Sequence, residues 1–135
     1  MKKSLRNKCW DAFSEMVRSK ASDWKGEVRC YTCGATGRWK GDRFQAGHFQ
    51  SGRCNAILFD EEQIRVQCYS CNCCKAGEQY EFGKKLEKEY GIDKVKEFKK
   101  RRHQTLKYSP KDYEAMTKVF KEKTKMYIAE KGLEQ

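Results

Sequence analysis

The sequence predicts an α+β fold: a small core of two strands and a helix, clamped by a four-cysteine metal site, with an N-terminal helix before it and basic helices after it. Three observations predict this fold. Two Cys-x-x-Cys pairs are separated by 34 residues, two short segments nearby alternate in polarity, and apolar residues recur at helical spacing towards both ends of the chain.

The composition supports one small core. With 135 residues, 38% hydrophobic and 36% charged, we expect a single domain over 1–135. Within it we expect an N-terminal helix over 4–20, a metal-braced core over 26–90 and a basic helical extension over 91–135. Such a polar chain has little interior to bury, so a metal held by some of its eight cysteines would supply part of the stability.

The charge of the chain points to an anionic partner. Lys and Arg number 30 against 19 Asp and Glu, a net charge of +11, which favours a polyanion or an anionic membrane surface. No segment approaches the roughly 20 apolar residues of a membrane span, and the first residues lack the apolar stretch of a signal peptide. We therefore expect an intracellular protein without a membrane partner, whose cysteines are metal ligands and free thiols.

Helices are predicted at both ends and strands between them. Leu5, Cys9, Phe13, Met16 and Val17 share one helical face, which places Cys9 in the core. The segments "DRFQAGHF" and "QIRVQC" have the alternation of strands, and the 14 residues between His48 and Gln63 would form a loop. After Cys71, the sequence "NCCKAGEQYEFGKKLEKEYG" predicts a helix that ends before Gly91, which has the C′ position.

Two further helices are predicted in the last third of the chain. Asp93 can cap a short helix that ends near "KKRRHQ". Ser109, Pro110 and Asp112 then have the positions of N-cap, N1 and N3 in a long final helix.

The paired cysteines predict a structural zinc site. Cys30, Cys33, Cys68 and Cys71 have the spacing of a tetrahedral four-cysteine site. Cys71 and Cys74 form an alternative second pair, but the pair at 68 and 71 leaves the residues after it free for other work. Disulfides or buried thiols are the remaining alternative, and Cys54 is interpreted as non-ligating.

The residues around the zinc site resemble the HNH, or ββα-metal, nuclease motif. The matching features are "AGH" at the end of a strand, a polar residue five positions before a cysteine, and "CxxCN" leading into a helix with Lys75. The resemblance implies that His48 is the general base, Gln63 the middle position that holds the loop and the histidine, and Asn72 the ligand of a catalytic divalent ion. Gln63 replaces the family's asparagine, and Gly47 stands where some members have an acidic ligand.

A longer resemblance covers most of the chain. In this order, "FSEMVRSK", "CYTCGATGRWKGDRFQAGHF", "LFDEEQIRVQCYSCN" and "LEKEYGIDKVKEF" are similar to the phage NinG/Rap recombination endonuclease family. This implies a structure-selective DNA endonuclease that cleaves D-loops and Holliday junctions in the cytoplasm of an infected or lysogenic bacterial host. It also implies phage or host recombination proteins as partners, and symmetric resolution of a junction would suit a homodimer.

The expected chemistry is phosphodiester hydrolysis. A base must activate water, and a cation must stabilise the leaving 3′-oxygen. With Asn72 as its protein ligand, that ion would complete its shell with phosphate oxygens and water, which suits Mg²⁺ or Mn²⁺. The first candidates for contact with DNA phosphates are Arg53 and Lys75, and the densest basic cluster is Lys99, Lys100, Arg101 and Arg102.

Three alternatives stay open from sequence alone. The first is an HNH nickase without a preference for junctions. The second is a non-catalytic zinc protein that binds or anneals DNA for a recombination partner, with Gln63 and Gly47 as signs of a lost site. The third is a small RNA-binding protein, although the predicted strands lack a row of aromatic residues for stacking bases.

Overall fold

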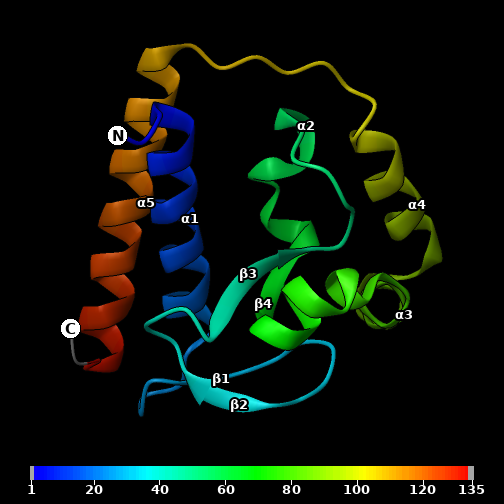
Figure 1. The fold of residues 1–135 in the computed structure, drawn as a ribbon, viewed down its shortest axis with the longest axis horizontal. Helices are drawn as coiled ribbons and strands as arrows, with labels where there is room; N and C mark the ends of the chain where they lie inside the picture. Colours follow the sequence, from blue (N-terminus) through cyan, green and yellow to red (C-terminus); the bar gives the residue numbers. More distant parts are fainter. Residues whose placement is uncertain (1, 134–135) are drawn as a thin grey trace.

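The structure is a computed structural model that describes residues 2–133, and it combines helices with two small sheets (Figure 1). Its main elements are α1 (Leu5–Ala21), β1 (Glu27–Arg29), β2 (Thr36–Arg38), β3 (Phe44–His48), α2 (Asn55–Leu58), β4 (Ile64–Cys68), α3 (Gln79–Tyr90), α4 (Ile92–Arg101) and α5 (Pro110–Lys131). Short helical turns η1 (Glu61–Gln63), η2 (Ser70–Cys74) and η3 (Ala76–Glu78) lie between them. The predicted mixture of helices with small sheets is confirmed.

The strands form two sheets of two antiparallel strands each. In the first, β3 pairs with β4, with Phe44 opposite Cys68 and His48 opposite Ile64. In the second, β1 pairs with β2. The β1–β2 hairpin was not predicted, because its strands have three residues each and are too short to show an alternation.

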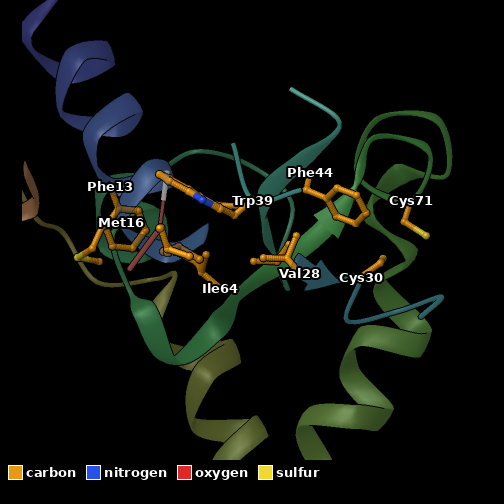
Figure 2. Packing of buried hydrophobic residues seen from close by; sticks show 12 residues of the cluster. Phe13, Met16, Val28, Cys30, Trp39, Phe44, Ile64 and Cys71 are labelled. Atoms are coloured by element: carbon orange, nitrogen blue, oxygen red, sulfur yellow. The ribbon is translucent and has the colours of Figure 1, made fainter. Parts of the chain in front are cut away.

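Helices cover both faces of the β3–β4 sheet. Successive side chains of a strand point to opposite faces. Figure 2 shows one cluster, which contains Phe44 of β3 and Ile64 of β4 together with Phe13 and Met16 of α1. On the other side, Phe82 of α3 and Phe98 of α4 are fully buried in a second cluster. In Figure 1, α1 and α5 therefore lie to the left of the sheet, and α3 and α4 to the right.

The first and last long helices pair along their length (Figure 1). Cys9 is fully buried on α1, as the apolar face predicted. The predicted capping box begins α5: Asp112 N donates to Ser109 Oγ at 3.1 Å, and Ser109 N donates to Asp112 Oδ2 at 2.8 Å. At the other end of α5, Lys131 Nζ donates to Ser19 O at 2.8 Å. The two helices therefore run in the same direction.

The helix predicted after Cys71 is wrong in its first part. Residues of η2 form a π-helical turn, and α3 begins only at Gln79. Between them, Ala76, Gly77 and Glu78 have positive φ angles of 51°, 79° and 50°. Glycine adopts such a φ without strain, and Gln67 Nε2 donates to Gly77 O at 2.8 Å, which holds the break in place.

Two smaller expectations were also wrong. Asp93 does not cap α4, because Gly91 is the N-cap and Asp93 lies in the first turn. The expected loop between β3 and β4 contains α2 and η1. Within residues 2–133 no helix is long and apolar enough to cross a membrane.

Candidate metal centre and candidate active site

The structure brings together the four cysteines that the sequence singled out. The Sγ atoms of Cys30, Cys33, Cys68 and Cys71 all lie within 4.8 Å of one another. Cys33 Sγ and Cys68 Sγ are 3.7 Å apart, whereas a disulfide is about 2.05 Å long. Thiolates at about 2.3 Å around a tetrahedral zinc would be about 3.8 Å apart. The cluster could therefore bind a metal such as zinc, and Cys74 lies outside it.

The elements that position these thiols come from distant parts of the chain. Cys30 and Cys33 lie in the β1–β2 connection, Cys68 ends β4, and Cys71 lies in η2. Thr32, between the first two, has its Oγ1 3.4 Å from Cys30 Sγ and accepts a hydrogen bond of 3.1 Å from Gln67 Nε2. A metal here would join three segments, and it would add to the hydrogen bonds that Tyr31 N makes to Val66 O and Gln67 Nε2 makes to Thr32 Oγ1.

The thiols do not ionise alike. Burial raises the pKa of Cys71 to about 12 and also raises the pKa of Cys68. Burial acts in the same direction on Cys30, but hydrogen bonds from Thr32 and the neighbouring backbone outweigh it and lower its pKa to about 6. Four thiolates crowded together repel one another, so a cation is needed for all of them to be ionised.

His48 is fixed from two sides at the end of β3. Its Nε2 lies 3.1 Å from Leu58 O, and its ring stacks on Trp10 of α1 with 4.9 Å between centroids and 20° between planes. Because a carbonyl only accepts, Nε2 carries the proton and Nδ1 keeps a free lone pair. Burial lowers the pKa of His48, and the charge of Arg53 lowers it further. The imidazole is therefore neutral at pH 7 and able to accept a proton.

Trp10 is a site residue that the sequence did not reveal. The Arg53 guanidinium lies 5.4 Å from the Trp10 ring centroid, so the indole contacts both the predicted base and the predicted phosphate ligand. Arg6, also on α1, donates to the Arg53 carbonyl oxygen. The only signal in the sequence was that Trp10 directly follows Cys9 on the apolar face of the first helix.

Gln63 supports the loop rather than the histidine itself. It is 1% exposed, and its Nε2 donates to Asp60 Oδ2 at 2.7 Å while its Oε1 accepts from Gln50 Nε2 at 2.5 Å. The loop it holds carries Leu58, whose carbonyl orients His48. The effect of Gln63 on His48 therefore passes through the main chain.

Asn72 lies at the other end of β3 from His48. Its Nδ2 donates to Gln45 Oε1 at 2.7 Å, and the three residues from Gln45 to His48 span about 10 Å of strand. A groove of about 330 Å³ follows the edge of β3 that has no strand partner within residues 2–133. Both Trp10 and Asn72 line it. The exposed Lys75 follows directly after η2.

The basic cluster at the end of α4 divides into two kinds of residue. Lys99, Lys100 and Arg102 are exposed. Arg101 Nη1 instead donates to Asp60 at 2.9 Å and Glu62 at 3.1 Å, and its Nη2 donates to Glu97 at 2.9 Å. Burial lowers the pKa of Arg101, but the hydrogen bonds and charges of these carboxylates have the larger effect, so the pKa is raised overall. Arg101 ties α4 to the loop that orients His48.

Comparisons with known proteins identify the family. Searches of curated proteins and of solved structures gave no significant match. The sequence model of the family described as Bacteriophage Lambda NinG protein matches residues 2–130, which is nearly the whole chain. The resemblance predicted from four separate segments is thereby confirmed. The chain belongs to the bacteriophage lambda NinG family, and this membership indicates a phage protein related to recombination.

Proposed function

We propose that this protein is a metal-dependent DNA endonuclease that cleaves branched recombination intermediates such as D-loops and Holliday junctions. The observation that carries the proposal is the state of His48: a neutral imidazole with a free Nδ1, oriented by a backbone carbonyl and an indole ring, with a guanidinium beside it. A general base in phosphodiester hydrolysis needs these properties.

In the proposed reaction, His48 Nδ1 removes a proton from the attacking water. The water oxygen bonds to phosphorus, the bond from phosphorus to the 3′-oxygen breaks, and that oxygen takes up a proton from solvent water, while His48 later releases its proton to solvent. The products carry a 5′-phosphate and a 3′-hydroxyl. Arg53 would hold the phosphate, since its guanidinium is exposed and next to the ring that supports His48.

A catalytic Mg²⁺ or Mn²⁺ would stabilise the negative charge on the leaving 3′-oxygen. Asn72 offers one neutral oxygen for it, because its Nδ2 already donates to Gln45 and Oδ1 is left over. A Cβ at Gly47 would lie 1.9 Å from Gln67 Oε1, so Gln67 excludes an acidic ligand there. The donor set fits Mg²⁺, which usually keeps several waters.

We further propose that β3, β4 and the helical segment after them are an HNH core whose helix is split at Gly77. The four cysteines would hold a structural zinc that fixes η2, and with it Asn72, against β4. The residues that would contact DNA phosphates are Arg53, Lys75, Lys99, Lys100 and Arg102. Arg101 instead positions the loop between β3 and β4 through its hydrogen bond to Asp60.

A non-catalytic DNA-binding accessory protein is the second candidate. One observation favours it: Asn72 bonds to Gln45 at the end of β3 remote from His48. In this case the metal centre would serve only the fold, and the basic surface would bind DNA for a recombination partner.

Cleavage assays separate the candidates. Purified wild-type protein with added Mg²⁺ or Mn²⁺ should cut a Holliday junction and a D-loop faster than a linear duplex of the same sequence at the same salt concentration. His48→Ala should lower the cleavage rate at least about 100-fold. His103→Ala is the comparison at the only other histidine: His103 is exposed and lines a different groove from the one beside Trp10, so its loss should lower the rate by much less than 100-fold.

Each other outcome has a defined meaning. Equal cleavage of branched and linear DNA would favour the nickase. Absence of cleavage by the wild type with either ion, together with retained binding to DNA, would favour the accessory protein. Equal cleavage by wild type and His48→Ala would contradict the proposed mechanism.

A further inference from the structure

A second groove lies on the other side of the molecule from α1 and α5. It has a volume of about 800 Å³ and runs between α3, the end of α4 and the residues that follow β3. Its walls include Tyr80 and Lys84 from α3, and Lys99 and Arg102 from α4. We name it the Tyr80 groove. None of the proposed catalytic residues lines it.

One wall of the Tyr80 groove presents an aromatic ring to solvent. Tyr80 is 75% exposed, so it contributes little to the core. Lys84 lies one helical turn later, with its Nζ 4.8 Å from the Tyr80 ring centroid. Phe49 and Gly83 are buried lining residues, and a Cβ at Gly83 would lie 2.9 Å from the Phe49 ring. The missing side chain leaves an apolar strip beside the exposed ring.

The charge of the Tyr80 groove favours a phosphate chain. Lys84, Lys99 and Arg102 are exposed cations, and Glu87 is the one acidic lining residue. Proteins that bind single strands combine such cations, which follow the backbone, with exposed aromatic rings on which bases stack. In a duplex the bases are already stacked inside, so an isolated ring at a groove wall has no base face to contact. An unpaired strand fits this chemistry better than a duplex does.

The Tyr80 groove also lies close to the proposed active site. Phe49, Gln50 and Ser51 line it and directly follow His48, so at most about 11 Å of chain separates His48 from Ser51. Arg102 reaches the same loop, since a Cβ at Gly52 would lie 3.7 Å from Arg102 Nη2. At about 3.4 Å per nucleotide along a strand, this distance corresponds to about three nucleotides.

We infer that the Tyr80 groove binds an unpaired DNA strand next to the scissile phosphodiester. This inference rests on the proposed endonuclease function and deepens it: the groove would select D-loops and other branched DNA with an unpaired strand by holding that strand. Base stacking on Tyr80 is independent of sequence, so the site needs no code for reading bases.

Binding measured by fluorescence anisotropy tests the inference. The probes are a labelled single-stranded oligothymidine, a linear duplex, and the same duplex with a single-stranded flap, all without added Mg²⁺ or Mn²⁺. Tyr80→Ala should raise the Kd for the single strand and the flap at least about fivefold, and the Kd for the linear duplex less than about twofold. Tyr80→Phe, which keeps the ring, should bind like wild type. For the single strand, log K falls as log salt rises, and Lys84→Ala and Lys99→Ala should each make this slope less negative by about 0.7.

Trp24→Ala is the matched control. Trp24 is 72% exposed and has Lys25 Nζ 5.2 Å from its ring, but it lies beside the β1–β2 hairpin and outside the Tyr80 groove. Its loss should leave all three affinities unchanged. Since both rings are exposed, both variants should fold, which an unchanged Tm would verify.

The inference is overturned if Tyr80→Ala binds the single strand like wild type, or weakens the linear duplex equally. It is also overturned if Trp24→Ala shows the same loss, or if wild type binds a single-stranded RNA of the same length more tightly than the DNA. Cleavage of D-loops without any effect of Tyr80→Ala would refute the groove alone. Loss of flap binding in Tyr80→Ala, combined with no cleavage by wild type, would refute the endonuclease and leave the groove standing.

Discussion

Replacing Trp10 by alanine should change the orientation and the pKa of His48 while the histidine itself is kept. The indole stacks on the imidazole at 4.9 Å and lies 5.4 Å from the Arg53 guanidinium. An aromatic pair contributes about 0.5–1.5 kcal/mol beyond burial, and an exposed cation–π pair about 0.5–1 kcal/mol. If this energy of about 1–2.5 kcal/mol holds the base and the phosphate ligand in place, cleavage by Trp10→Ala should fall roughly 5- to 70-fold.

The same change should move the titration of His48. Burial is the main cause of its lowered pKa, and Trp10 supplies part of that burial. In Trp10→Ala the pKa should therefore rise towards 6.5, and the acidic limb of the pH–rate profile should move to higher pH with it. Trp10→Phe keeps an aromatic ring and should stay close to wild type in both respects.

Proton NMR measures this titration independently of cleavage. The chain has only two histidines, so a His103→Gln variant assigns both imidazole signals. Truncating the half-buried Trp10 should cost about 2 kcal/mol of stability, which a domain of ordinary stability survives. The reasoning is refuted if wild-type His48 titrates at or above pH 6.5, or if Trp10→Ala leaves its pKa where it was.

Two further predictions concern stability. The purified chain should contain about one zinc per molecule by elemental analysis, and removal of this zinc with a chelator should lower Tm by about 10 °C or more. Cys33→Ala should lose the metal. Zinc retained by Cys33→Ala, or zinc lost by Cys74→Ala, would contradict the assignment of the ligands. Gly47→Ala should destabilise the fold by about 1–3 kcal/mol in urea denaturation, because the new methyl group meets the buried and anchored Gln67. Adding Gln67→Ala should relieve that clash, so the cost of the double variant should be well below the sum of the two single costs, and additive costs would show that the clash is not the cause.

Local patterns predicted the parts of this structure that depend on neighbours in sequence. Ligand spacing identified the four clustered cysteines, because two knuckles around one metal need the same short separation in each pair. Alternating polarity located β3 and β4, and the capping box placed the start of α5 at Pro110. In each case the physical requirement acts within a few residues.

Contacts between distant segments could not be predicted in the same way. The stacking of Trp10 on His48 joins residues 38 positions apart, and neither residue carries a sign of the other. The break before α3 includes positive φ angles at Ala76 and Glu78, which local preference disfavours and only the surrounding structure imposes. Likewise, Arg101 looked like a surface cation until the fold surrounded it with three carboxylates.

The pairing of α1 with α5 also determines when α1 can reach its final packing during synthesis of the chain. Lys131 anchors to the end of α1, more than 100 residues earlier in the sequence, and such distant contacts slow folding. During synthesis α1 is available almost at once, but its supporting helix comes last. Until α5 has emerged, α1 lacks one of the elements it packs on, so Trp10 orients His48 less firmly. If the protein is the endonuclease proposed above, partly made chains would therefore cut DNA more slowly than the finished protein.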